Sequence, residues 1–247
     1  MSLSELTNPV FRNTFPALCA TVGFSLESAN VVGYNESKSS EAGFLLIAPQ
    51  FKNVGSDDFS IQNIKLGEGA TSWSDFLQVV DADAVGQEIY YYASADESGF
   101  EADGWLSADM SALADVSLAP GQSALLYTEA ESTYSDVGEV SKVSSVTPSV
   151  AGFNILGNNT PVDLNVQEIT LGEGATSWSD FIQFLDEQAV GLADIYYYAT
   201  ADESGFAADG WLSADMSSLA NFDIPAGKGF LLYTEAADVN ITIPSAL

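Results

Sequence analysis

The chain contains no histidine. Histidine is the usual general base in catalysis, the partner of serine or cysteine nucleophiles, and the commonest ligand of transition metals. Its absence argues against triad chemistry and the usual zinc sites. The sequence contains no recognisable catalytic motif, and we predict that the protein is not an enzyme.

Cysteine is almost absent, since Cys19 is the only one among 247 residues. A single cysteine cannot form a disulfide within the chain, so stability must come from packing. The sequence also lacks an apolar run as long as the roughly 18 residues that a membrane helix needs. We therefore predict no transmembrane segment.

Basic residues are few, because five Lys and one Arg stand against 35 acidic residues, which gives a formal net charge of −29. Such a surface repels phosphate backbones and anionic lipids, so we expect no nucleic-acid partner. Salt or bound cations would relieve the self-repulsion. Hydrophobic residues still make up 47% of the chain, which predicts a folded protein.

The N-terminal residues 1–29 differ from the rest of the chain. One basic residue, Arg12, precedes an apolar stretch at 15–26, with the small residues Gly23 and Ser25 at its end. This outline predicts a degenerate secretory signal peptide. The alternative is a retained arm that packs on the domain or on a neighbour. The signal-peptide interpretation predicts an exported protein, extracellular or at the cell surface.

The chain contains an internal repeat. Residues 66–76 recur letter for letter as 171–181, and residues 102–111 match 208–217. Repetition at a fixed period indicates tandem copies of one structural unit. We predict a first repeat at 30–131, a linker at 132–138 and a second repeat at 139–247. The identity could reflect a shared site or a recent duplication.

Strand signals dominate each repeat. β-branched and aromatic runs bounded by Gly, Pro, Asp and Ser predict strands at 43–47, 59–66, 88–94 and 123–129. A capping box at Ser72 and Asp75, followed by apolar residues at helical spacing, predicts a short helix to about residue 81. The predicted fold is mainly β, with two tandem antiparallel β-sandwich or barrel-like domains, each with one short helix.

Four segments of the first repeat resemble a group of uncharacterised secreted bacterial proteins. They are residues 28–34, the strand at 43–48, the segment 104–106 and the closing residues 118–126. In that group, a signal peptide ending near Ser-Ala is followed by Asn-Val-Val-Gly-Tyr and one or more β-rich units. The resemblance extends over most of residues 28–243. It implies export and a β-rich fold, and it implies no catalytic residue.

Acidic loops are the candidate metal sites. Carboxylates cluster near glycines in 96–104 and again in 202–210, and oxygen ligands on a tight turn suit Ca²⁺, the one cofactor that the sequence suggests. The spacing differs from an EF-hand, and a solvated acidic hairpin is the alternative. The candidate ligands are Asp96, Asp103, Asp109, Asp202, Asp209 and Asp215.

Aromatic residues are the candidate ligand-binding positions. Trp105, Trp211, Tyr91 and Tyr197 are the residues that we expect to stack on a sugar, with core packing as the alternative. Three consecutive tyrosines in a strand must place at least one ring on each face.

These patterns lead to one functional hypothesis and one alternative. The first is a non-enzymatic structural protein that assembles with copies of itself into a filament, layer or matrix. The alternative is a binding module that depends on carbohydrate or Ca²⁺, with polysaccharide as the partner.

Overall fold

Both repeats fold into the same series of short strands. The computed structural model describes residues 32–38, 42–80, 87–185 and 192–245. The residues of the predicted signal peptide or arm, 1–29, lie outside the described residues. No helix in the described ranges has the length and apolar character needed to cross a membrane.

The elements of repeat 1 are β1 (Val32–Lys38), β2 (Gly43–Ile47), β3 (Phe51–Lys52), β4 (Phe59–Ser60), η1 (Ile61–Asn63), β5 (Ile64–Leu66), β6 (Phe76–Val80), β7 (Gln87–Ala93), α1 (Ala95–Ser98), β8 (Gly104–Trp105), β9 (Ser117–Leu118), β10 (Ala124–Thr128) and β11 (Thr133–Val140). Those of repeat 2 are β12 (Ser145–Pro148), β13 (Gly152–Gly157), β14 (Leu164–Asn165), η2 (Val166–Glu168), β15 (Thr170–Leu171), β16 (Phe181–Leu185), β17 (Leu192–Ala199), α2 (Ala201–Ser204), β18 (Gly210–Trp211), β19 (Asp223–Ile224), β20 (Gly229–Thr234) and β21 (Asn240–Ile243).

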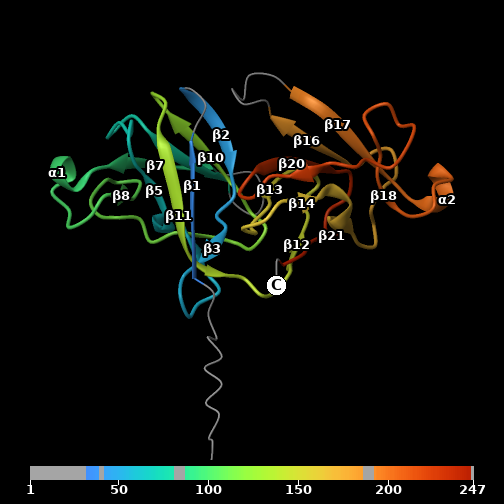
Figure 1. Cartoon of the computed structure of the whole chain (residues 1–247), viewed down its shortest axis with the longest axis horizontal. Coiled ribbons are helices and arrows are strands. Elements are labelled where there is room, and N and C mark those ends of the chain that lie inside the picture. The colour runs from blue at the N-terminus through green and yellow to red at the C-terminus, as the bar shows by residue number, and fades with distance from the viewer. Residues whose placement is uncertain (1–31, 39–41, 81–86, 186–191, 246–247) are drawn as a thin grey trace, which may run out of the picture.

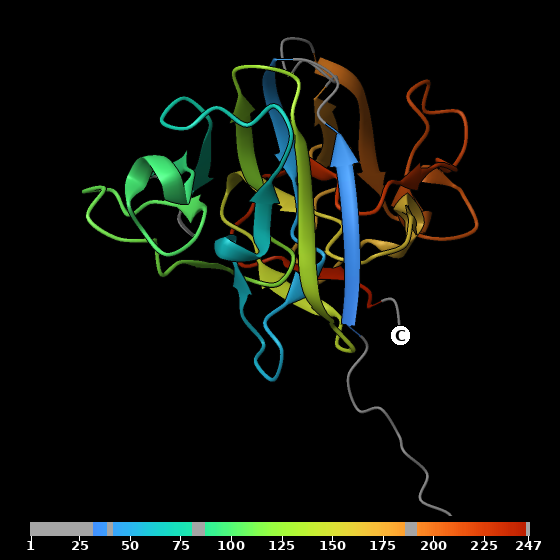
Figure 2. The same cartoon turned by 60° about the vertical axis from the view of Figure 1, so that its left-hand side comes forward.

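Each repeat contains a five-stranded antiparallel sheet and a smaller sheet. The large sheets have the strand orders β2-β10-β6-β7-β8 and β13-β20-β16-β17-β18. In repeat 1 the smaller sheet is β1-β11-β3, with β5 also paired to β11, and in repeat 2 it is β12-β21-β15. Figure 2 shows β1 and β11 as a long antiparallel pair. The prediction of a mainly β fold is confirmed.

The core of each repeat lies between its large and small sheets. Strand alternation directs Leu77, Tyr90 and Leu126 to this side, where they meet Ile64 and Leu66 of β5. A second, equivalent cluster fills repeat 2. Tyr90 and Tyr92 are buried while Tyr91 is half-buried on the opposite face, as the alternation of three tyrosines in a strand requires.

The helix predicted after Ser72 is absent, and β6 occupies most of that segment. The Asp75 carboxylate does not cap a helix. It accepts hydrogen bonds from the backbone N–H groups of Thr71, at 2.7 Å, and Glu129, at 2.8 Å, and so fixes a turn before the strand. Among the described residues, repeat 1 has a short α-helix, α1, after β7 instead. Repeat 2 has its counterpart, α2, after β17.

The segment predicted as a linker, 132–138, lies in strand β11 apart from its first residue. β11 pairs with β1, β3 and β5, and Tyr134 packs against the core of repeat 1. Pairing on both edges therefore holds a polar segment in the sheet. The connection between the repeats is residues 141–144.

The two repeats join through reciprocal contacts. The N–H of Ala48 donates to the carbonyl of Gly227 at 2.8 Å, and the N–H of Gly157 donates to the carbonyl of Gly121 at 3.0 Å. These pairs occupy equivalent positions in the two repeats. Two antiparallel bridges, Ile47 to Lys228 and Gln122 to Leu156, are equivalent in the same way. The reciprocity indicates an approximate twofold axis through the join.

The large sheets separate above this join. In Figure 1, β2 and β10 lie on one side and β16 and β17 on the other, while α1 and α2 lie at opposite ends of the molecule. The two large sheets meet where β2 approaches β20, with Ile47 bridged to Lys228, and where Ser123 donates to the carbonyl of Leu156 at 2.6 Å.

Candidate functional site

A row of four aromatic rings crosses the large sheet of repeat 1. Antiparallel pairing places Phe44, Tyr127, Phe76 and Tyr91 on neighbouring strands in that order. Their ring centroids are 4.9 to 6.0 Å apart. Leu77, the residue after Phe76 in β6, points into the core. Because successive side chains of a strand point to opposite faces, the row lies on the face away from the core.

Repeat 2 carries the equivalent row. Phe153, Tyr233, Phe181 and Tyr197 follow one another across the sheet, with ring centroids 5.0 to 5.9 Å apart. Phe153 is the most open of these rings, with 46% of its surface exposed. The duplication has therefore preserved a complete aromatic row.

A second, uncharged row runs beside each aromatic row on the same face. In repeat 1 it consists of Leu46, Leu125, Gln78 and Ile89, and in repeat 2 of Ile155, Leu231, Gln183 and Ile195. We call the aromatic row and its neighbouring row, in both repeats, the aromatic faces. They contain no charged residue, although the chain has a net charge of −29.

The aromatic faces turn toward each other at the join. A Cβ atom built on Gly229 would lie 2.7 Å from the Cβ of Leu46 and 2.9 Å from the Oγ of Ser123. Leu46 belongs to the face of repeat 1, and Gly229 lies on the same side of its strand as Leu231. All ring contacts among the described residues fall within one repeat. The two rows therefore do not pack on each other.

The geometry of the rings decides which contacts the faces can make. The rings of Phe76 and Tyr127 lie at 19° to each other, and those of Phe181 and Tyr233 at 9°. Stacked neighbours cover each other's flat surfaces and present their edges outward. Ile89 and Phe153 are exposed, Leu46 and Gln183 are buried, and the other members of the two faces are half-buried. A surface of this kind suits the packing of apolar side chains, and apolar surface left open to water marks an interaction site.

Of the four predicted sugar-stacking residues, only Tyr91 and Tyr197 lie in these rows. Trp105 and Trp211 are fully buried in the cores, where each indole N–H donates to a backbone carbonyl, that of Ile64 or Ile169, at 2.8 Å. They therefore offer no surface to a ligand. Their position is a correction: the large apolar indole is used for packing.

The acidic loops are held by internal hydrogen bonds. The Asp103 carboxylate accepts from the N–H of Ala95 at 2.6 Å, and Asp209 accepts from that of Ala201 at 2.7 Å, at the starts of α1 and α2. Burial and the nearby Asp103 carboxylate raise the pKa of Tyr92 to about 12.

Asp109 shows the same use of a carboxylate. It accepts from the hydroxyls of Ser107 and Ser111, both at 2.7 Å, and Asp215 makes equivalent bonds in repeat 2. These bonds lower the pKa of both carboxyl groups.

Asp96 and Asp202 lie in the first turns of α1 and α2, which are at opposite ends of the molecule (Figure 1). Within the described ranges, no three acidic or cysteine side chains gather as a metal site. Calcium binding by these loops stays a prediction.

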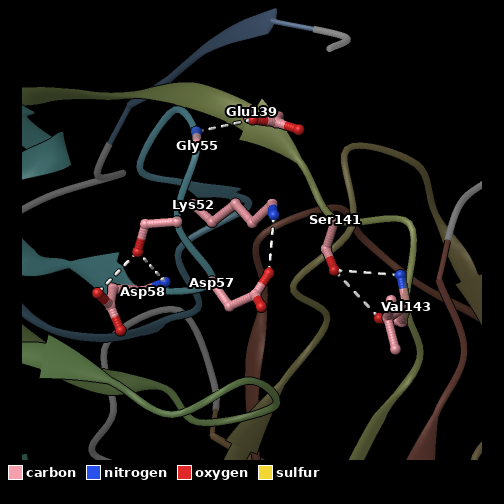
Figure 3. Close-up of polar contacts among 8 residues, drawn as sticks. Lys52, Gly55, Asp57, Asp58, Glu139, Ser141 and Val143 are labelled. Carbon is pink, nitrogen blue, oxygen red and sulfur yellow. Dashed lines mark hydrogen bonds and ion pairs between the residues drawn. The ribbon is translucent and has the colours of Figure 1, made fainter. Parts of the chain in front are cut away.

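A depression of about 340 Å³ lies beside the connection between the repeats. Figure 3 shows the polar contacts around it: Lys52 Nζ binds Asp57 Oδ1 at 2.8 Å, and the Ser141 hydroxyl donates to the carbonyl of Val143 at 3.1 Å. An exposed ion pair of this kind contributes little to stability. Lys52 and Asp57 are the charged residues that line the depression, and we assign no function to it.

Comparison of the chain with protein-family models, with curated proteins and with solved structures gives no match.

The sequence patterns did not reveal Phe44, Phe76, Tyr127 and their counterparts. A signal was present, because Phe44 and Tyr127 each alternate with buried residues inside predicted strands. Their association depends on which strands pair, and the sequence does not specify that pairing.

Proposed function

We propose that this protein is an exported, non-enzymatic structural protein that assembles with copies of itself through the aromatic faces. The observation that carries the proposal is a charge-free apolar surface, present on both repeats, in a chain whose net charge is −29. Exposed apolar surface is costly in water, and its burial against a partner is favourable.

A second copy is the partner that this surface fits best. Two molecules with the same strong negative charge repel each other least where they meet through uncharged surfaces. The faces also spread across two sheets, which suits an interface between proteins better than a small ligand, since protein interfaces contain about 20 to 30 residues a side. Export to the cell surface or medium, and assembly into a filament, layer or matrix, complete the proposal.

Charge insertion tests the proposal with a matched control. The double variant Phe44→Glu/Phe153→Glu places one carboxylate in each aromatic row. The control Val143→Glu/Val146→Glu adds the same two charges at valines with exposures of 75% and 60% near the repeat connection. Sedimentation velocity at about 0.5 M salt, where charges are screened within a few Å, compares both with the wild type.

We expect the wild type and the control to sediment as assemblies, and Phe44→Glu/Phe153→Glu to sediment as a folded monomer. Equal assembly of the two double variants would contradict the role of the aromatic faces. A monomeric wild type across the accessible concentration range would contradict self-assembly itself.

A further inference from the structure

Two exposed tryptophans occupy equivalent turns of the two repeats. Trp73 and Trp178 have exposures of 43% and 44%, with backbone φ angles of 67° and 66°. A left-handed backbone favours Gly or Asn and is costly for a bulky residue. The backbone conformation therefore does not favour a tryptophan at either position, and more than two-fifths of each residue stays exposed.

The turn that carries each indole is fixed by other groups. In repeat 1 the buried Asp75 carboxylate binds the N–H groups of Thr71 and Glu129, and the N–H of Trp73 donates to the carbonyl of Tyr92 at 2.8 Å.

Repeat 2 repeats the arrangement. Asp180 accepts from Thr176 and Glu235, each at 2.8 Å, and the N–H of Trp178 donates to Tyr198 at 2.8 Å. Both indoles are thus held on rigid turns before any ligand binds, which reduces the entropy lost on binding.

The residues that flank each indole within its turn are polar. They are Thr71, Ser72 and Ser74 in repeat 1, and Thr176, Ser177 and Ser179 in repeat 2. Among the described residues, no ring contact involves either exposed tryptophan, in contrast to the stacked rows of the aromatic faces.

We propose that Trp73 and Trp178 are two binding sites for a neutral polysaccharide. The exposed indole stacks on the apolar face of a sugar ring, while hydroxyl groups of the same turn, such as those of Ser74 and Ser179, bind sugar hydroxyls. The negative charge of the chain disfavours an anionic polymer. A hot spot for a protein partner lies in a well-packed pocket whose surroundings exclude water, whereas each indole here stands on a turn flanked by polar residues.

The position of the two sites adds avidity. The hydroxyl of Ser72 bonds to that of Ser94, the residue before α1, and Ser177 bonds equally to Thr200 before α2. Each tryptophan turn therefore lies beside a helix at one end of the molecule (Figure 1). One molecule can hold two chains, or two points on one chain, and paired weak sites bind far more tightly than either alone.

The two tryptophan turns are identical in sequence, because residues 66–76 recur as 171–181. We expect the Trp73 and Trp178 sites to bind the polymer with similar affinity.

The test is native gel electrophoresis of the full chain in gels containing hydroxyethyl cellulose, laminarin or galactomannan, three soluble neutral polysaccharides. The variants are Trp73→Asn, Trp178→Asn and the double variant, because Asn tolerates a left-handed backbone. The control is Met110→Asn/Met216→Asn. These methionines are also exposed, at 45% each, with φ angles of 57° and 59°.

We expect at least one polymer to retard the wild type and the methionine control equally. Trp73→Asn and Trp178→Asn should each weaken binding at least fivefold, and the double variant should not be retarded. The melting temperature of each tryptophan variant should equal or exceed that of the wild type, which separates lost binding from lost folding.

Three results would overturn the proposal. They are no retardation of the wild type by any of the three polymers, equal retardation of the double variant, or loss of self-assembly in the double variant, which would make the tryptophans protein contacts. Phe44→Glu/Phe153→Glu should keep its polysaccharide binding, so this proposal can fail or hold independently of self-assembly.

Discussion

The carboxylate of Asp136 accepts a hydrogen bond from the backbone N–H of Gln50, and a second from that of Phe51 at 3.3 Å. The equivalent position of repeat 2 is Ile243, an apolar core residue. In repeat 2, Thr160 stands at the position of Phe51, and its backbone N–H donates to the side-chain oxygen of Asn158 at 3.0 Å. Repeat 1 has Pro49 at the position of Asn158 and uses a buried carboxylate instead.

This difference predicts a pH-dependent stability that Asp136 controls. Burial raises the pKa of Asp136 from the ordinary value of 3.8 to about 6, despite its backbone hydrogen bonds. The folded state thus binds the proton more tightly than the unfolded state, and the stabilisation is lost as the pH rises from about 4 through about 6. A pKa change of this size corresponds to about 3 kcal/mol.

The measurement is urea unfolding of the wild type and Asp136→Asn at pH 4.5 and pH 7. Other carboxylates affect both proteins equally. The change in the free energy of unfolding between the two pH values therefore differs between the two proteins only by the contribution of Asp136. We expect the wild type to lose more stability than Asp136→Asn between these values. An equal loss of unfolding free energy in the two proteins would show that folding does not raise the pKa of Asp136.

The buried tryptophans give a prediction about stability. Trp105 and Trp211 are fully buried, and each indole satisfies a backbone carbonyl. Truncation of such a residue to Ala costs about 3–5 kcal/mol. We expect Trp105→Ala or Trp211→Ala to lower the melting temperature strongly, whereas Trp73→Asn should not. Equal melting of all three variants in circular dichroism would contradict the assigned burial.

The strand positions show what sequence reasoning could and could not reach. Alternation and turn residues identified the segments that became β2, β7 and β10, because local propensity and burial agree there. The helix after Ser72 was wrong because an Asp three residues after a Ser fits a capping box as well as a turn. Only the distant N–H of Glu129 decides between them.

The site was harder to predict than the fold. Trp105 and Trp73 are both tryptophans in repeated segments, and the sequence does not show that the first fills the core and the second lies exposed at a positive φ angle. Likewise, the aromatic rows exist only after strands far apart in the chain have paired.

The duplication predicts that repeat 2 folds alone. It has its own core, and all its named strands pair within it. We expect residues 141–247, which begin after β11, to melt cooperatively but at a lower temperature than the full chain. The reason is that the hydrogen bonds from Asn159 to Pro49 and Gln122 are lost. A fragment with no cooperative transition would show that the join is required for folding.

Assembly and cations should be linked. The strong negative charge opposes contact between copies, and screening or bridging by divalent ions offsets that cost. We expect light scattering to show that chelation in low salt loosens the assemblies and that millimolar Ca²⁺ restores them. Asp103→Asn/Asp209→Asn should blunt the response. If the chelator does not change the size of the assemblies at low ionic strength, Ca²⁺ has no role in assembly.

Electron microscopy of the purified protein in about 0.5 M salt tests self-assembly most directly, because this salt shortens the range of charge repulsion to a few Å. We predict ordered filaments, layers or particles built from many copies, which disappear in Phe44→Glu/Phe153→Glu and persist in Val143→Glu/Val146→Glu. A field of separate monomers in the wild type, across concentrations and with Ca²⁺ present, would contradict the structural function proposed for this protein.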